Sequence, residues 1–428
     1  MPALDRDAYV ADFADFIRDS PSSYHAAAAV AARLEADGFE RLDERDEWPA
    51  GPGRRVVVRD GAVIAWVQPE AATATSPYRI LGAHTDSPSF KLKPNPTSAS
   101  DGFLQAGVEV YGGPLLNSWL DRELELAGRI VTRDGVEHLV RTGPMLRIPQ
   151  LAIHLDRDVT KSLTLDKQRH LQPVWGSAAD APGADLLAEA ARDAGVTDPG
   201  EVAGHDLFLA DTQPPARFAR GGGLFAAGRM DNLASVYAGL VALLAAAVDT
   251  AHMSVLAAFD HEEIGSASRS GATGPFLEDV LARISAGLGA DGTDRRRAFA
   301  DSWLLSSDTG HAVHPNYSER HDPGNRPVLG GGPLLKLNAN QRYASDAVGS
   351  ALWARVCEQA GVSTQAFVSN NSIPCGTTIG PLSAARLGIR TVDVGAPLLS
   401  MHSARELAHV DDLAGLASAV TAFFAPAG

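Results

Sequence analysis

Acidic and histidine side chains follow several apolar segments of this chain, at the points where those segments end. Those directly after an apolar segment are His84 and Asp86, Glu262 and Glu263, and Asp308; Asp231 follows a glycine-rich loop, and His402 follows a strand after a short loop. When such segments are parallel strands, the residues after their carboxyl ends meet in one crevice, where ligands bind. Two imidazoles and three carboxylates suit a pair of metal ions such as zinc. A further carboxylate beside them suits a general base.

Each of these residues, taken alone, also has a structural explanation. His84 and Asp86 could form a hydrogen-bonded surface turn, Asp308 could cap a helix, and His402 could be a core histidine. Two adjacent carboxylates directly after an apolar run, as at Glu262 and Glu263, are unusual because buried charges need partners. The recurrence of the same residue types therefore favours a metal site.

Motifs of other enzyme classes are incomplete. The segment His261-Glu-Glu-Ile-Gly265 begins like the helix of a single-zinc protease but ends in glycine. Gly221-Gly-Gly-Leu-Phe-Ala226 nearly fits a dinucleotide-binding loop but follows prolines instead of a strand. The chain also lacks the G-x-S-x-G motif of serine hydrolases.

The elements that must position these residues alternate between strands and helices. Amphipathic and apolar patterns predict helices at 5–19, 22–36, 231–248, 344–360 and 405–424, and strands at 78–83, 253–259, 302–307, 366–369 and 391–394. Residues 55–59 and 62–68 flank Asp60-Gly61 and predict a hairpin. This alternation predicts an α/β domain with a mostly parallel sheet flanked by helices.

The middle of the chain has a different character. It is rich in proline and glycine and contains short strand patterns at 107–111, 127–132 and 136–141. We therefore predict a β-rich second domain at 95–222, inserted into a first domain formed by 1–94 and 223–428.

Composition narrows the class of protein. The chain has 428 residues, with 37 Lys and Arg against 52 Asp and Glu, and a formal net charge of −15. This charge argues against binding to nucleic acid or to an anionic membrane. Two cysteines, Cys357 and Cys375, exclude a disulfide framework. The absence of a signal-peptide pattern and of an apolar run of about 18 residues makes the cytoplasm the expected location.

The motifs around the candidate ligands resemble signatures of the aspartyl aminopeptidase family, which are di-zinc metallo-aminopeptidases of the zinc exopeptidase type. The main matches are Gly82-Ala-His-Thr-Asp-Ser-Pro88, Gly228-Arg-Met-Asp-Asn232, Phe259-Asp-His-Glu-Glu-Ile-Gly-Ser266, His311-Ala-Val-His-Pro-Asn-Tyr317, Pro374-Cys-Gly-Thr-Thr-Ile-Gly-Pro381 and Met401-His-Ser403. They occur in the family's order and span most of the chain. Departures at Met230 and at Thr309-Gly310 flank ligands without replacing them.

The resemblance implies a role for each candidate residue. Asp231 would bridge two zinc ions per subunit. His84 and Asp308 would complete the ligands of one ion, and Glu263 and His402 those of the other. Glu262 would be the general base that takes a proton from a metal-bridging water, the nucleophile, and passes it to the leaving amine. Asp86 would orient His84.

The resemblance also implies a substrate. The family prefers peptides whose free N-terminus carries Asp or Glu, and Lys336 matches the position credited with binding that acidic side chain. Tyr343 lies nearby, His311 would line the site, and His154, in the inserted domain, would reach a neighbouring subunit's site. Without the resemblance, Lys336 could be a strand lysine with a solvated ammonium group. His154 could equally be a core histidine, and His311 could lie on a helix or loop face.

By the same resemblance, the inserted domain would dimerise and the dimers would assemble into a homo-oligomeric dodecamer. Two other functions stay open at this point. One is a related di-zinc enzyme, either an aminopeptidase of neutral specificity or a deacylase. The other is a non-catalytic shell protein that kept the fold.

Overall fold

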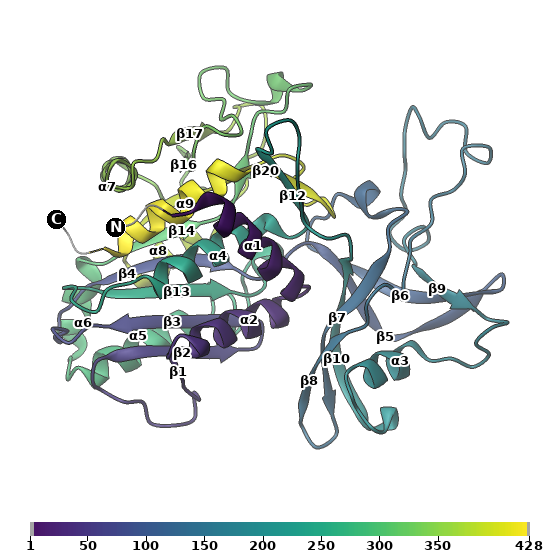
Figure 1. The fold of residues 1–428 in the computed structure, drawn as a ribbon, viewed down its shortest axis with the longest axis horizontal. Helices are drawn as coiled ribbons and strands as arrows, with labels where there is room; N and C mark the ends of the chain where they lie inside the picture. The colour runs from purple at the N-terminus through teal and green to yellow at the C-terminus, as the bar shows by residue number, and fades with distance from the viewer. Residues whose placement is uncertain (1–3, 426–428) are drawn as a thin grey trace.

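A computed structural model describes residues 4–425 of the chain. Its larger part is a nine-stranded sheet in the order β1-β2-β3-β13-β4-β14-β18-β16-β17, with helices on both faces (Figure 1). The strands are β1 (Glu40–Arg41), β2 (Gly53–Arg59), β3 (Ala62–Gln68), β4 (Tyr78–His84), β13 (Met253–Phe259), β14 (Trp303–Ser307), β16 (Leu334–Leu337), β17 (Gln365–Val368) and β18 (Arg390–Gly395).

The centre of this sheet is parallel, as predicted. Strands β13, β4, β14 and β18 are consecutive parallel neighbours, and five of the eight neighbouring pairs in the sheet are parallel. Strands β4 and β13 are apolar along almost their whole length and nearly fully buried, which is typical of parallel strands covered on both faces. Their carboxyl ends therefore open at one edge of the sheet.

Helices cover the two faces of the sheet in separate groups. Because side chains alternate along a strand, Val63, Leu81 and Leu256 pack on one face, whereas Ile64, Ile80 and Val255 pack on the other. The first face is covered by α1 (Arg6–Asp19), α2 (Ser23–Ala36), α4 (Met230–Leu244), α7 (Ala347–Ala360) and α9 (Val410–Phe424). The second is covered by α5 (Phe276–Gly287), α6 (Gly292–Ala300) and α8 (Ile379–Leu387).

The two N-terminal helices begin where the sequence predicts. The carboxylate of Asp5 accepts hydrogen bonds from the backbone N–H groups of Asp7 and Ala8, and the Ser22 hydroxyl accepts one from His25. Both are N-cap contacts that satisfy free donors in the first turn.

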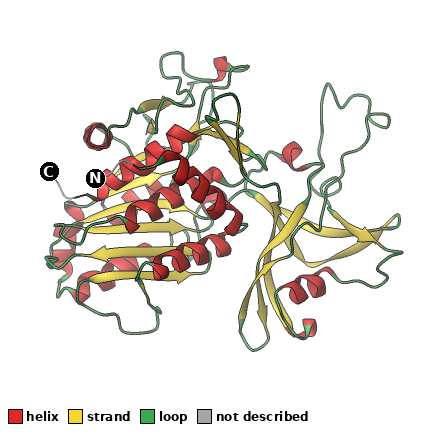
Figure 2. Ribbon diagram, viewed as in Figure 1, coloured by secondary structure: helices red, strands yellow, loops and turns green. Residues whose placement is uncertain are grey.

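The second part of the chain is an antiparallel six-stranded sheet in the order β8-β7-β10-β5-β6-β9, which Figure 2 shows as a mostly yellow unit beside the helix-covered sheet. Its elements are β5 (Ser89–Ser100), β6 (Phe103–Tyr111), β7 (Leu124–Thr132), β8 (Glu137–Arg141), β9 (Val174–Ser177), α3 (Leu186–Asp193) and β10 (Val202–Asp211). Its own apolar core includes Phe90, Leu126 and Leu207. The domain limits at 95 and 222 stay a prediction.

The helix predicted at 405–424 begins later than expected. Residues Glu406–His409 form strand β20, which pairs with β12 (Leu224–Ala227), and β12 pairs in turn with β11 (Ala216–Phe218). Burial alternates along β20, with Glu406 and Ala408 buried and their neighbours half-buried, so these residues follow the period of a strand. The predicted helix at 231–248 likewise ends early, at Leu244.

Two more strands, β15 (Gly310–His311) and β19 (Pro397–Leu398), form a short parallel pair. Within residues 4–425, no helix has the length and apolarity needed to span a membrane.

Candidate metal centre

The first cluster of candidate ligands forms where β4, β14 and α4 meet. His84 is the last residue of β4, Asp308 follows β14, and Asp231 lies at the start of α4. The His84 Nε2 atom lies 3.5 Å from Asp231 Oδ1 and 3.7 Å from Asp308 Oδ1. These three side chains can therefore present one atom each to a single ion.

The second cluster shares Asp231 with the first. The other carboxylate oxygen, Asp231 Oδ2, lies 3.2 Å from His402 Nε2, which lies 3.5 Å from Glu263 Oε2. Glu263 follows β13 in a single 3₁₀ turn, Glu262–Ile264. Asp231 thus directs one oxygen toward each cluster.

The residues present fit zinc. Asp231 Oδ1 and Glu263 Oε1 are buried and accept no hydrogen bond within the described chain, so both have free lone pairs that a cation would satisfy. The ligand atoms within each cluster lie within 4.8 Å of one another. Imidazole nitrogen and carboxylate oxygen atoms are common zinc ligands.

The acidic residues of the centre bring several negative charges together in a partly buried site. Burial, together with the carboxylates of Asp308 and Asp86, raises the pKa of Glu262 to about 7, although His84 opposes this shift. Burial and the Asp231 carboxylate also raise the pKa of Glu263 well above its usual range. Bound cations reverse such shifts because they supply the positive charge that the site lacks.

Backbone carbonyl groups orient both histidines. The Nδ1 atom of His84 lies 3.0 Å from the Asp86 carbonyl oxygen, and that of His402 lies 3.0 Å from the carbonyl oxygen of Gly113. When Nδ1 donates its proton to these carbonyls, Nε2 of each ring is left free to face the carboxylates.

The side chain of Asp86 has a wider role than the predicted orientation of His84. Its Oδ1 atom lies 3.4 Å from His84 Nδ1. Its carboxylate also accepts backbone hydrogen bonds from Glu262 at 3.0 Å and from Glu263 at 3.1 Å, and one from the Tyr111 hydroxyl at 2.8 Å. Asp86 therefore fixes the turn that carries the candidate base and one candidate ligand.

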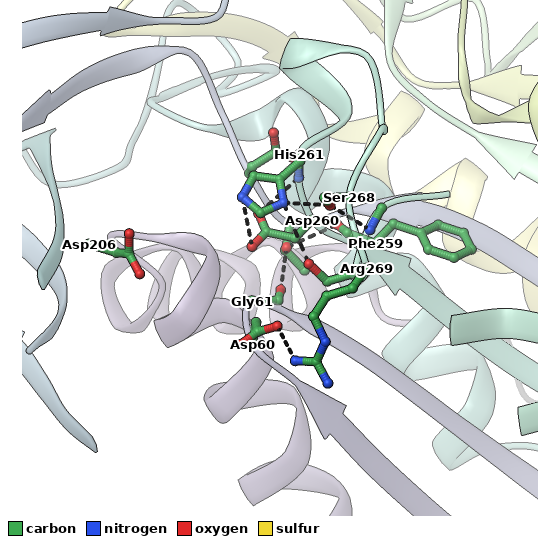
Figure 3. Close-up of polar contacts among 12 residues, drawn as sticks. Asp60, Gly61, Asp206, Phe259, Asp260, His261, Ser268 and Arg269 are labelled. Atoms are coloured by element: carbon green, nitrogen blue, oxygen red, sulfur yellow. Dashed lines mark hydrogen bonds and ion pairs between the residues drawn. The ribbon is translucent and has the colours of Figure 1, made fainter. Parts of the chain in front are cut away.

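The turn between β2 and β3 contacts the segment that carries His84 and Asp86. The Thr85 hydroxyl donates to the Gly61 carbonyl at 2.6 Å, and Figure 3 shows Asp260 and His261 above the Asp60–Gly61 turn, with Ser268 beside His261. A Cβ atom on Gly61 would lie 2.3 Å from Asp260 Oδ2, so only glycine fits this close approach. His261 has a φ of 64° and its Nδ1 lies 2.8 Å from the Ser268 hydroxyl.

Three residues that contact the candidate site residues were not predicted from the sequence. Tyr111 is the last residue of β6 in the six-stranded sheet and contacts Asp86, and Gly113, two residues later, contacts His402. Glu406, in β20, accepts hydrogen bonds from the backbone of Asp231 and His402. The strand predicted at 107–111 placed Tyr111 at the end of a strand. No local sequence pattern indicates a role for Gly113 or Glu406.

Lys336 lies beside the centre and does not reach solvent. Its side chain is 3% exposed, and its ammonium donates to the Thr309 carbonyl at 2.6 Å. The Nζ atom also lies 3.7 Å from Asp308 Oδ2 and 5.5 Å from the centroid of the Tyr343 ring. A strand lysine with a solvated head group is therefore excluded.

The two other predicted histidines lie apart from the ligands. His311 lines a cleft with His321, Tyr343 and Phe367, and its ring contacts Phe367 edge-on at 6.1 Å between centroids. His154 is exposed on the loop that precedes β9. Within residues 4–425 of one chain, no hydrogen bond or ion pair joins His154 to the candidate ligands.

Comparisons with known proteins show the family to which the chain belongs. The family model described as aminopeptidase I zinc metalloprotease (M18) matches residues 16–424. The chain is 54% identical over 420 residues to a Streptomyces coelicolor protein named probable M18 family aminopeptidase 2, covering 97% of each.

Solved structures are similar over nearly the whole chain. A chain in the cryo-EM structure of the Ape4 and Nbr1 complex is 34% identical with a TM-score of 0.94, over 98% of this chain and 86% of that one. The S. cerevisiae mApe1 dodecamer is 30% identical with a TM-score of 0.85, over 98% and 96%. The chain therefore belongs to the M18 family of zinc metalloproteases and is an aminopeptidase of that family.

Proposed function

We propose that this enzyme removes N-terminal Asp or Glu residues from peptides by means of two zinc ions. The observation that carries the two-ion proposal is the orientation of the Asp231 carboxylate. Its two oxygens face separate histidines, His84 at 3.5 Å and His402 at 3.2 Å. His84 and Asp308 would complete the ligands of one ion, and Glu263 and His402 those of the other. Zinc, when bound, supplies Lewis acidity that polarises a carbonyl group and activates water.

Glu262 is the proposed general base. Its backbone N–H is held by Asp86, and no hydrogen bond occupies its side chain within residues 4–425. The carboxylate is therefore free to take a proton from the attacking water and to return it to the amine of the leaving peptide. This assignment gives the adjacent acidic residues Glu262 and Glu263 different tasks.

Lys336 is the proposed determinant of the acidic preference. It is a buried cation beside Asp308, and its hydrogen bond to Thr309 uses one of its three N–H donors. The remaining donors can bind the side-chain carboxylate of an N-terminal Asp or Glu, and a charge-assisted hydrogen bond of this kind is strong in a dry site. Tyr343 and His311 would line the same pocket.

The test is kcat/KM on peptides that begin with Asp, Glu, Leu or Lys, with zinc added, for wild type and Lys336→Met. We expect wild type to prefer Asp and Glu, because Lys336 binds their carboxylates. Loss of a hydrogen bond to a charged group costs about 1.5–3 kcal/mol, so Lys336→Met should lose roughly 10- to 100-fold on these two substrates. A preference for Leu, or an equal loss on all four peptides, would remove the acidic pocket and leave an aminopeptidase of neutral specificity.

We further propose that the enzyme is a dodecamer built from dimers, in which His154 reaches a neighbouring subunit's site. Similarity to the mApe1 dodecamer supports this assembly. Around His154, Leu151, Ile153 and Leu155 expose 57%, 51% and 76% of their surface, an apolar cluster that a partner subunit would cover. Sedimentation velocity should show a single twelve-subunit species, and Leu155→Asp should dissociate it; a monomeric wild type would contradict the assembly.

A further inference from the structure

Glu406 is a buried acidic residue that the proposed reaction does not use. It begins β20, its relative exposure is 2%, and it lies next to the metal centre without contributing to either ligand cluster. Its Oε2 atom accepts a hydrogen bond from the backbone N–H of Asp231 at 3.0 Å. Its Oε1 atom accepts one from the backbone N–H of His402 at 2.9 Å. One carboxylate therefore binds the peptide groups of two candidate ligands of the same ion.

The segments that carry these two ligands adopt conformations that need support. Arg229, Ser400 and His402 have φ values of 61°, 58° and 65°, in the left-handed region that non-glycine residues rarely occupy. Such conformations persist only where the surrounding structure holds them in place. The hydrogen bonds to Glu406 are contacts that would hold both segments at once.

The position of Glu406 suits this task. In the β12–β20 pair, Glu406 lies opposite Ala227, two residues before Arg229. Leu399 and Leu407 exchange backbone hydrogen bonds of 2.9 and 3.0 Å, which close the loop that carries His402. Glu406 therefore projects from a paired strand between two segments that are far apart in sequence.

We propose that Glu406 is a positioning residue that fixes the spacing of Asp231 and His402, and that affinity for the ion bound by Asp231, Glu263 and His402 depends on it. The inference rests on the proposed two-zinc centre. Hydrogen-bonding partners outside the ligand set typically change metal affinity by roughly 10- to 100-fold when they are mutated. Of the proposed ligands of the other ion, Glu406 contacts only Asp231. The affinity for that ion should therefore change less.

The test is Glu406→Gln, which keeps the shape of the side chain but turns an amide N–H toward one of the two backbone donors. Zinc affinity and stoichiometry are measured by competition with a chromogenic chelator, and the melting temperature is measured without zinc. We expect one of two zinc ions to bind roughly 10- to 100-fold more weakly.

Asp412→Asn is the matched control. Asp412 is also a fully buried carboxylate, and it accepts two backbone hydrogen bonds of 2.7 Å, from Gly330 and Gly332. Its hydrogen bonds do not involve the candidate ligands. We expect Asp412→Asn to lower the melting temperature and to leave both zinc affinities unchanged, so a merely structural role of Glu406 would make the two variants alike.

Wild-type zinc affinity in both sites of Glu406→Gln would overturn the inference while leaving the two-zinc centre intact. Fewer than two zinc ions on wild type would overturn both. If Glu406→Gln does not fold, Glu406→Asp replaces it, because its carboxylate is one methylene too short to reach both donors. A several-fold weaker zinc ion in Glu406→Asp supports the proposal, and unchanged binding of both ions overturns it.

Discussion

The two carboxylate oxygens of Asp231 face different histidines, and those histidines come from distant parts of the chain. His84 closes β4, whereas His402 lies in the loop between β19 and β20. The carbonyl groups of Asp86 and Gly113 fix the rings so that both Nε2 atoms face Asp231. At the residue scale, backbone groups therefore hold the candidate ligand atoms in place, which is the preorganisation that metal sites require.

Glu262→Gln gives a direct test of the proposed base. The amide keeps the size of the side chain but cannot accept the proton from the attacking water, so we expect kcat to fall roughly 10²-fold or more. Zinc content should stay at the wild-type value because Glu262 belongs to neither of the two proposed ligand sets. Turnover near the wild-type rate would remove Glu262 from the mechanism, and loss of zinc would make it a ligand.

Most of the candidate site residues were predictable from sequence because they come directly after an apolar segment with a clear pattern. Glu262 and Glu263 come directly after the apolar run of β13, and Asp308 comes directly after β14. The supporting residues were not predictable in this way. Glu406 contacts only backbone N–H groups of Asp231 and His402, more than 170 residues away in one case. Because every residue other than proline has a backbone N–H group, such contacts do not depend on which residue is the partner and cannot be read from the sequence.

At the scale of elements, the strands predicted for the central sheet agree with the structure, whereas β5, β10 and β20 were not predicted. Strand β13 covers 253–259, as predicted, because seven consecutive buried residues set its length. The four residues of β20 were assigned to the following helix, since the apolar residues of 405–424 also fit a helical period. Pairing with β12 decides the conformation there, and that partner is about 180 residues earlier in the chain.

The β2–β3 turn shows how an element can support a site without contributing to it. Asp60-Gly61 predicted a hairpin, and the structure confirms it. The same turn accepts the hydroxyl of Thr85 and leaves room beside Asp260 only for a glycine. Thr85 lies between His84 and Asp86, so this hairpin packs beneath the metal centre. The sequence identified the turn but could not show what lies above it.

At the scale of the whole molecule, the metal centre lies where the two sheets meet. His84, Glu263 and Asp308 lie at the ends of strands of the nine-stranded sheet. Tyr111, at the end of β6 of the other sheet, and Gly113 and Leu115, just after it, contact Asp86 and His402. The inserted part therefore orders the centre within one chain, in addition to its proposed role in assembly. Composition and charge could not show this, because both describe the chain without its contacts.

We propose that one chain holds two zinc ions through a shared Asp231. The most direct measurement is the zinc content per chain after saturation and gel filtration, for wild type and for Asp231→Ala. We predict two zinc ions for wild type and almost none for Asp231→Ala, because the substitution removes a ligand from both clusters. A single zinc ion on wild type, or wild-type zinc content in Asp231→Ala, would contradict a two-zinc centre that shares Asp231.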